Sequence, residues 1–181
     1  MKDKRTVFIF FLGYFNWDKT DEREIPYRRL STEGEERARE LKNQFAEYKV
    51  SFDLKLINTT QAAMQTARLI EENPALRAIK ALDMGRNLAT FAGELNGEPV
   101  GRYANLDHPP SDACLASAIE SWIRNAKAEM IATIKQSDAD TVLVVTEPIL
   151  AYALALQFRK DEAVITAVPK HGTYVGAKVV I

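Results

Sequence analysis

Cysteine is nearly absent from this sequence, and long apolar runs are missing. Cys114 is the only cysteine in 181 residues, which excludes a disulfide framework within the chain and favours a reducing compartment, the cytoplasm. No apolar stretch approaches the roughly 20 residues that a membrane-spanning helix needs. The apolar run at 7–12 follows basic residues, as in a signal peptide, but no small-residue cleavage site comes after it. A buried strand is therefore predicted there, and no membrane is expected as a partner.

An excess of charge of one sign is also lacking. Lysine and arginine number 24 and aspartate and glutamate 25, and the two kinds are interspersed, so no nucleic acid is expected as a partner. Histidine is scarce, and neither His108 nor His171 has a second ligand at metal-binding spacing. No metal site and no cofactor are predicted.

What is present is the pattern of an α/β protein. A hydrophobic content of 46% and a charged content of 27% are ordinary for a globular chain, and the length suits one domain over 1–181. Apolar strands alternate with amphipathic helices, and the glycine- and proline-rich stretch 85–110 is predicted to be a loop or lid. The predicted strands are 7–12, 52–57, 78–84, 141–146, 163–168 and 174–181, and the predicted helices are 32–48, 61–72, 111–136 and one that begins at Pro148.

Local signals place the element boundaries. Ser31 or Thr32 can cap the first helix, and Glu35 would complete a capping box with Thr32. The turn 58–60 can cap the second helix. The strand at 7–12 is apolar without interruption, which is typical of a strand covered on both faces. These features predict a three-layer αβα fold with a largely parallel sheet.

Four motifs stand in a fixed order after this first strand. They are Leu30-Ser31-x-x-Gly34-x-x-Arg37-Ala38, the stretch 58–67 with its Gln65-Thr66-Ala67, the loop 91–97, and the strand end 142–148. With Gly13 and Trp17 in register, they resemble the landmarks of the histidine phosphatase superfamily, also called phosphoglycerate mutase-like. The resemblance covers nearly the whole chain and implies that family's fold.

The resemblance also assigns catalytic positions, and unusual residues occupy them. Enzymes of that family hold a phosphoryl group between two histidines and two arginines, and a carboxylic acid protonates the leaving group. Phe11 stands at the first arginine, Leu12 at the nucleophilic histidine, Ala62 at the second arginine, Glu147 at the second histidine and Ala89 at the acid. No catalytic residue of the family type is therefore expected.

This replacement predicts a loss of phosphate chemistry. A leucine cannot become a phosphoenzyme, and two missing guanidiniums remove the fork-shaped donors that suit phosphate. The leading hypothesis is a catalytically inactive homologue that serves as a binding, regulatory or assembly module. One alternative is an enzyme that reuses the cleft for other chemistry, with Glu147 as acid or base. Another is a divergent phosphatase whose motif is served by His171 or His108.

Several residues near these positions are candidates for binding a ligand. They are Tyr14, Trp17, Asp18, Thr59, Glu94 and Glu147. Phe11 and Leu12 can equally be packed core, and Glu147 can be a simple helix-start carboxylate. The aromatic residues at 11, 14, 15 and 17 can line an apolar pocket or a protein-binding face, which is compatible with a homodimer. The expected partner is an unknown protein or a small apolar or cationic ligand.

Overall fold

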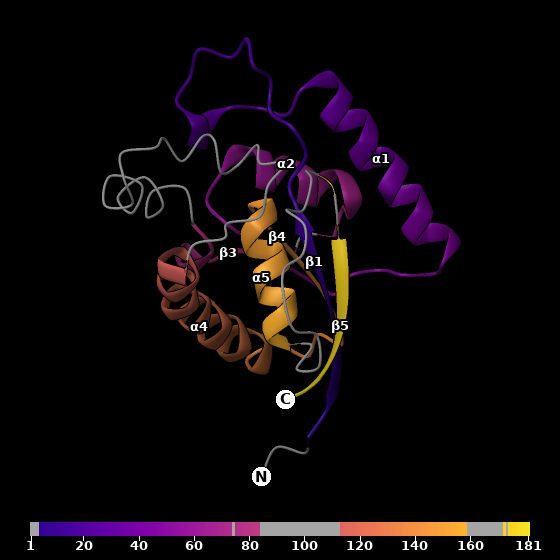
Figure 1. The fold of residues 1–181 in the computed structure, drawn as a ribbon. Helices are drawn as coiled ribbons and strands as arrows, with labels where there is room; N and C mark the ends of the chain where they lie inside the picture. The colour runs from indigo at the N-terminus through magenta and orange to yellow at the C-terminus, as the bar shows by residue number, and fades with distance from the viewer. Residues whose placement is uncertain (1–3, 74, 84–112, 159–171, 173) are drawn as a thin grey trace.

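The computed structural model describes residues 4–73, 75–83, 113–158, 172 and 174–181. Within these residues, helices pack on both faces of one central sheet (Figure 1). The elements in chain order are β1 (Thr6–Gly13), η1 (Ile25–Tyr27), α1 (Thr32–Glu47), β2 (Leu54–Ile57), α2 (Gln61–Ile70), β3 (Leu76–Ala78), η2 (Lys80–Leu82), α4 (Ala113–Lys135), β4 (Thr141–Thr146), α5 (Pro148–Phe158) and β5 (Tyr174–Val180).

The sheet is largely parallel, as the sequence predicts. Its strand order is β3-β2-β4-β1-β5, and the pairs β3–β2, β2–β4 and β4–β1 are all parallel. Only β5 among the described strands runs antiparallel, at the outer side of β1. The parallel strands therefore share a carboxyl edge, where β1, β2 and β4 all end.

Strand alternation divides the core into two layers. The odd-numbered residues of β1 from Val7 to Phe11 pack with α4 and α5, whereas Leu12 packs with α1 and α2. The Phe11 ring lies 5.4 Å from that of Phe158 in α5. This division explains why residues 9–12 of the strand are apolar, and it confirms the three-layer arrangement. Phe8, by contrast, is exposed.

Two predicted boundaries need correction. The predicted strand 78–84 is wrong for residues 79–83, because β3 ends at Ala78 and the 3-10 helix η2 follows. Met84 lies outside the described residues. Ile79 and Leu82 are the buried residues of this stretch, and their three-residue spacing is that of a helical turn rather than a strand. The capping box is also absent: Ser31 is the N-cap and accepts a hydrogen bond from Gly34 N, so Glu35 is one residue too far along.

Other predicted boundaries agree with the structure, and two predicted segments lie outside the described residues. The strand 141–146 and the helix start at Pro148 are confirmed, and Thr60 caps α2 by accepting from Ala63 N at 3.2 Å. The predicted loop 85–110 and strand 163–168 lie outside the described residues. No helix in the described part of the chain is long and apolar enough to cross a membrane.

Candidate functional site

The carboxyl ends of three strands meet at one place in the sheet. Leu12 of β1 and Ile57 of β2 both pair in register with Val145 of β4. The three strand ends therefore lie side by side at one edge of the sheet. Ligands of open parallel sheets collect outside this edge, so the polar groups there are the first candidates for a site.

Glu147 is the carboxylate of this edge, and side chains hold it. Asn58 Nδ2 donates to Glu147 Oε2 at 3.1 Å, and Thr146 Oγ1 lies 3.0 Å from the same oxygen. Thr146 Oγ1 also donates to the Leu82 carbonyl at 2.7 Å. Asn58 and Thr146 are completely buried, whereas Glu147 is partly exposed. The carboxylate is thus held by two buried side chains, in a residue that is partly exposed.

Asn58 is oriented by the start of α2. Its Oδ1 accepts from Thr60 N at 3.1 Å and from Thr60 Oγ1 at 2.7 Å. Because the amide oxygen is occupied in this way, the amide NH₂ group is directed at Glu147. The short segment between β2 and α2 therefore caps the helix and holds the carboxylate at once.

Tyr14 lies beside Glu147 and is buried at 3% exposure. Burial raises the pKa of its hydroxyl well above the ordinary value of 10.0, and the negative charge of Glu147 raises that pKa further. Tyr14 is therefore a neutral phenol at physiological pH. Its ring lies 5.8 Å from that of Trp17, and its backbone N donates to Thr146 O.

Gly13 allows β1 to approach the start of α5 closely. A Cβ at this position would lie 2.7 Å from Pro148 Cα, which is closer than packed atoms tolerate. Any side chain here would push the strand away from the helix that begins directly after Glu147. Close packing against Pro148 therefore explains why a glycine stands at position 13.

A second carboxylate stands near this network. Asp83, which directly follows η2, accepts from Thr59 N at 2.5 Å and from Thr59 Oγ1 at 2.7 Å. Sequence reasoning missed Asp83, Asn58 and Thr146 as members of the site. The position of Asn58 and Thr146 at the ends of buried strands was the available signal.

The remaining candidate residues that the structure describes lie in the core or in a separate loop. Phe11, Leu12 and Ala62 are buried at 1%, 0% and 2% exposure and contribute to the core rather than to a cavity. The Asp18 carboxylate accepts from Thr20 N and Thr20 Oγ1 within its own loop, and the Thr20 hydroxyl lowers its pKa. Ala89, Glu94, His108 and His171 lie outside the described residues.

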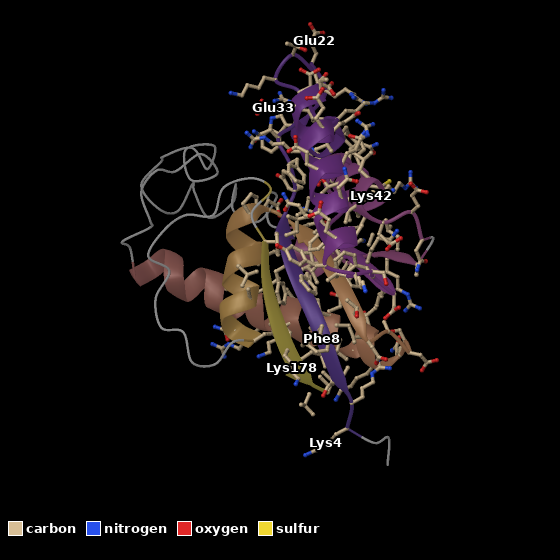
Figure 2. The ribbon with its side chains drawn as sticks, turned by 90° about the vertical axis from the view of Figure 1, so that its right-hand side faces the viewer. Lys4, Phe8, Glu22, Glu33, Lys42 and Lys178 are labelled. Atoms are coloured by element: carbon tan, nitrogen blue, oxygen red, sulfur yellow. The ribbon has the colours of Figure 1, made fainter. Side chains whose placement is uncertain are left out.

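The aromatic residues expected to line a pocket are mostly buried. Tyr14 and Phe15 are 3% and 4% exposed, and Phe11 is fully covered by α5. The exposed ring of β1 is Phe8 instead, which is 47% exposed, with Lys178 Nζ 5.8 Å from its centroid (Figure 2).

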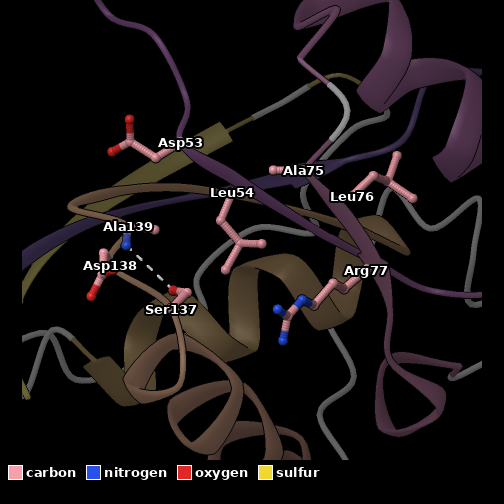
Figure 3. Close-up of a pocket in the computed structure, with 8 residues that line it drawn as sticks. All are labelled: Asp53, Leu54, Ala75, Leu76, Arg77, Ser137, Asp138 and Ala139. Carbon is pink, nitrogen blue, oxygen red and sulfur yellow. Dashed lines mark hydrogen bonds between the residues drawn. The ribbon is translucent and has the colours of Figure 1, made fainter.

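An open pocket lies at the opposite edge of the sheet. Figure 3 shows it between the start of β2, the start of β3 and the turn before β4, with a volume of about 520 Å³. Of the two aspartates that line it, Asp53 and Asp138, Asp53 accepts from Asp140 N at 3.1 Å and from Thr141 N at 3.0 Å. Asp53 therefore holds the turn that leads into β4, and we place the candidate site at the carboxyl edge instead.

Comparison with known proteins supports the fold. No protein-family model and no curated protein matches the sequence. Solved structures do match: a phosphoglycerate mutase from Bacillus anthracis has a TM-score of 0.63 at 15% identity, over 99% of this chain and 93% of that chain. The protein histidine phosphatase SixA complexed with tungstate has a TM-score of 0.59 at 15% identity, over 98% and 94%. The fold is phosphoglycerate mutase-like.

A third neighbour bears on the predicted function. It is a phosphoserine phosphatase mutant from Entamoeba histolytica in complex with phosphoserine, with a TM-score of 0.57 at 14% identity over 96% of this chain and 94% of that chain. Neighbours that are phosphatases contradict the prediction of an inactive binding, regulatory or assembly module. They favour its alternative, a divergent phosphatase. The prediction counted five positions as empty, although one of them, Glu147, carries an ionisable group held by two side chains.

Proposed function

We propose that this chain is a divergent phosphatase, an enzyme that hydrolyses phosphate esters with Glu147 as its acid–base group. One observation carries the proposal: a partly exposed carboxylate is fixed by Asn58 and Thr146 where three parallel strands end. Groups that transfer protons in catalysis need this combination of fixed geometry and access to the reacting atoms. The fold shared with phosphatases over nearly the whole chain supports the choice of reaction.

In this proposal, water attacks phosphorus directly. Leu12 offers no nucleophile and is sealed in the core, so a phosphoenzyme at that position is excluded. The two helices that begin at the carboxyl edge, α2 and α5, direct the positive ends of their dipoles toward it. Helix N-termini favour anions, and they are the groups that we propose to receive the phosphate in place of the missing arginines.

A panel of phosphate esters tests this proposal. Phosphoserine and small alkyl and aryl phosphates would be offered to the purified chain, and release of inorganic phosphate would be measured. We expect release above the enzyme-free blank for at least one ester. Glu147→Gln should abolish it, whereas Glu36→Gln, an exposed carboxylate on α1, should not. No release across the panel would overturn the proposal.

A second candidate function is favoured by the charges of the site. Glu147 and Asp83 bring two carboxylates to this edge, and positions 11, 12 and 62 contribute no cation. This arrangement suits a small apolar or cationic ligand, on which Glu147 would act as acid or base. Hydrolysis of neutral or cationic esters and amides, with phosphate esters inert, would identify this alternative.

Location and assembly are also proposals. We place the chain in the cytoplasm because its single cysteine suits a reducing compartment. We also propose a homodimer, because the aromatic ring of Phe8 is exposed on β1 and contact with a second copy would cover it. Light scattering with and without Phe8→Ser would test the assembly, and a monomeric wild type would exclude it.

A further inference from the structure

The pocket at the amino edge of the sheet is a second place that can hold a small molecule. Residues 53–54 at the start of β2, 75–77 at the start of β3 and 137–139 in the turn before β4 line it (Figure 3). Its volume of about 520 Å³ falls within the range of roughly 300–1,000 Å³ that is typical of ligand pockets. The proposed hydrolysis makes no use of this amino-edge pocket.

Hydrogen bonds fix the wall of the pocket that the turn 137–139 forms. Arg5 Nη2 donates to Ser137 O at 2.6 Å and to Ile134 O at 2.7 Å, which ties the end of α4 to the segment before β1. Ser137 Oγ donates to Ile134 O at 2.8 Å and accepts from Ala139 N at 3.4 Å (Figure 3). This wall is therefore fixed before any ligand binds.

The wall before β3 is fixed by Asn73 and Lys55. Asn73 Oδ1 accepts from Ala75 N at 2.9 Å, and Asn73 Nδ2 donates to Phe52 O at 3.3 Å. Lys55 is buried at 1% exposure, and its Nζ donates to the backbone carbonyls of Glu71 and Asn73. Because a ligand that binds between fixed walls does not have to order them, this construction favours binding.

Arg77 and Leu54 project from the same face of the sheet. Arg77 pairs with Leu56 of β2, and Leu54 is two residues before Leu56, so the three side chains share a face. Leu54 and Leu56 belong to the layer that packs with α4 and α5. In Figure 3, Asp53 and Asp138 lie on one side of Leu54, and Arg77 lies on the other. The pocket therefore has an apolar middle between charges of opposite sign.

The charged groups at the two ends have unused hydrogen-bonding capacity within the described part of the chain. The side chains of Arg77 and Asp138 form no hydrogen bond or ion pair with a described residue, and they do not pair with each other. Asp53 accepts both of its hydrogen bonds with Oδ2, so Oδ1 has no described partner. A guanidinium presents a planar fork of donors that suits a carboxylate, and carboxylate oxygens accept hydrogen bonds from an ammonium.

From this arrangement, we propose that the amino-edge pocket binds a small ω-amino acid, a zwitterion whose carboxylate and ammonium are separated by an apolar chain. The carboxylate binds Arg77, and the chain lies over Leu54. The ammonium binds Asp138 and Oδ1 of Asp53. An α-amino acid carries both charges on one carbon and does not span Leu54. A lysine at the end of a peptide has the required separation and is the other source of this chemistry.

Titrations of the full ¹⁵N-labelled chain, followed by NMR, test the site with three matched probes. ε-Aminocaproate carries both charges, whereas caproate lacks the ammonium and hexylamine lacks the carboxylate. We expect ε-aminocaproate to shift the amide signals of Leu54, Arg77 and Ala139 and to bind about tenfold more tightly than either probe with one charge. Nα-acetyllysine copies the end of a peptide. Tighter binding of it than of ε-aminocaproate would assign the site to peptides that end in lysine, and weaker binding would assign it to the free acid.

Variants at the two ends of the pocket separate the two charges. Arg77→Gln should raise the Kd of ε-aminocaproate about tenfold and remove its advantage over hexylamine, because the ligand carboxylate loses its partner. Asp138→Asn should reduce its advantage over caproate for the corresponding reason. Ala75→Phe keeps both charges but fills the space, and it should prevent binding. Arg37→Gln and Glu36→Gln, at exposed positions of α1, are the matched controls and should leave the Kd unchanged.

Three results would overturn the inference. The first is the absence of shifts at the pocket when millimolar ε-aminocaproate is added to a wild-type chain whose NMR spectrum shows that it is folded. The second is equal binding of the three probes. The third is a Kd that both Arg77→Gln and Asp138→Asn leave unchanged. Binding is measured without turnover, so the presence or absence of phosphate release alters none of these results.

Discussion

Two carboxylates at opposite edges of the sheet, Asp53 and Glu147, differ in their hydrogen-bond partners. At the amino edge, Asp53 Oδ2 accepts from the backbone N–H groups of Asp140 and Thr141. At the carboxyl edge, Glu147 is contacted by the side chains of Asn58 and Thr146. Backbone partners tie Asp53 to the turn that leads into β4, whereas Glu147 is held by side chains alone among its hydrogen bonds given above. The open pocket at the amino edge and the candidate site at the carboxyl edge are therefore different places.

The largest effect that this comparison predicts concerns catalysis. Glu147→Gln should lower kcat/KM for a phosphate ester by about 10²–10⁴-fold, the usual contribution of a positioned proton-transfer group. Asp53→Asn keeps an acceptor oxygen for the same backbone groups and should leave kcat/KM within about twofold. Steady-state assays of both variants would check this, and equal losses would remove the distinction between the two edges.

The next effect concerns the layer beneath the carboxyl edge. Leu12 is completely buried among α1, α2 and β4, so Leu12→Ala should lower the free energy of unfolding by about 2–5 kcal/mol. Urea denaturation would measure it. Lys19→Ala, at an exposed loop residue, is the control and should change stability by less than about 0.5 kcal/mol. A small loss in Leu12→Ala would indicate that this position borders a cavity instead of core.

A smaller effect on stability should distinguish the two carboxylates. Asp53→Ala leaves the backbone groups of Asp140 and Thr141 without their acceptor and should cost about 1–2 kcal/mol. The comparable variant at the other edge, Glu147→Gln, keeps most contacts and should cost less. Thermal and urea unfolding of both variants, at matched pH, would show the difference. The reverse order would mean that Glu147 has the structural role and Asp53 does not.

The smallest effect is a dependence of stability on alkaline pH. The pKa of Tyr14 is raised in the folded state by burial and then by Glu147, so folding favours the neutral phenol. Its contribution to stability is fully present below the unfolded pKa of about 10 and is lost as the pH rises from there toward the folded pKa. Tyr14→Phe should flatten this part of the stability curve. An unchanged slope above pH 10 would mean that Tyr14 ionises freely in the folded chain.

The sequence predicted the strand and helix boundaries best where the chain is most apolar. The strand 141–146 is buried on both faces, and Pro148 can only begin a helix, so both boundaries agree with the structure. The segment 78–84 failed because a few apolar residues fit a strand or a helical turn equally well. The lengths of such short segments are decided by their neighbours in space.

The site was predictable only in part, for a physical reason. Glu147 was identified because a resemblance placed it at a catalytic position, but its partner Asn58 is 89 residues away in the chain. Nothing in a local pattern indicates that an amide will meet a carboxylate across two strands. The inactive module was predicted because each catalytic position was compared only with the residue that the family carries there. A different acid–base group at one of these positions, Glu147, was treated as the less favoured alternative.

The most direct test of the account is the pH dependence of phosphate release by the wild-type chain and by Glu147→Gln. If Glu147 is the acid–base group, the wild-type kcat/KM for a phosphate monoester should change with pH as the Glu147 carboxyl ionises. The residual rate of Glu147→Gln should lack this change and keep only the dependence that ionisation of the substrate causes. Phosphate release no faster than the enzyme-free blank at every pH, or the same profile in both proteins, would contradict the account.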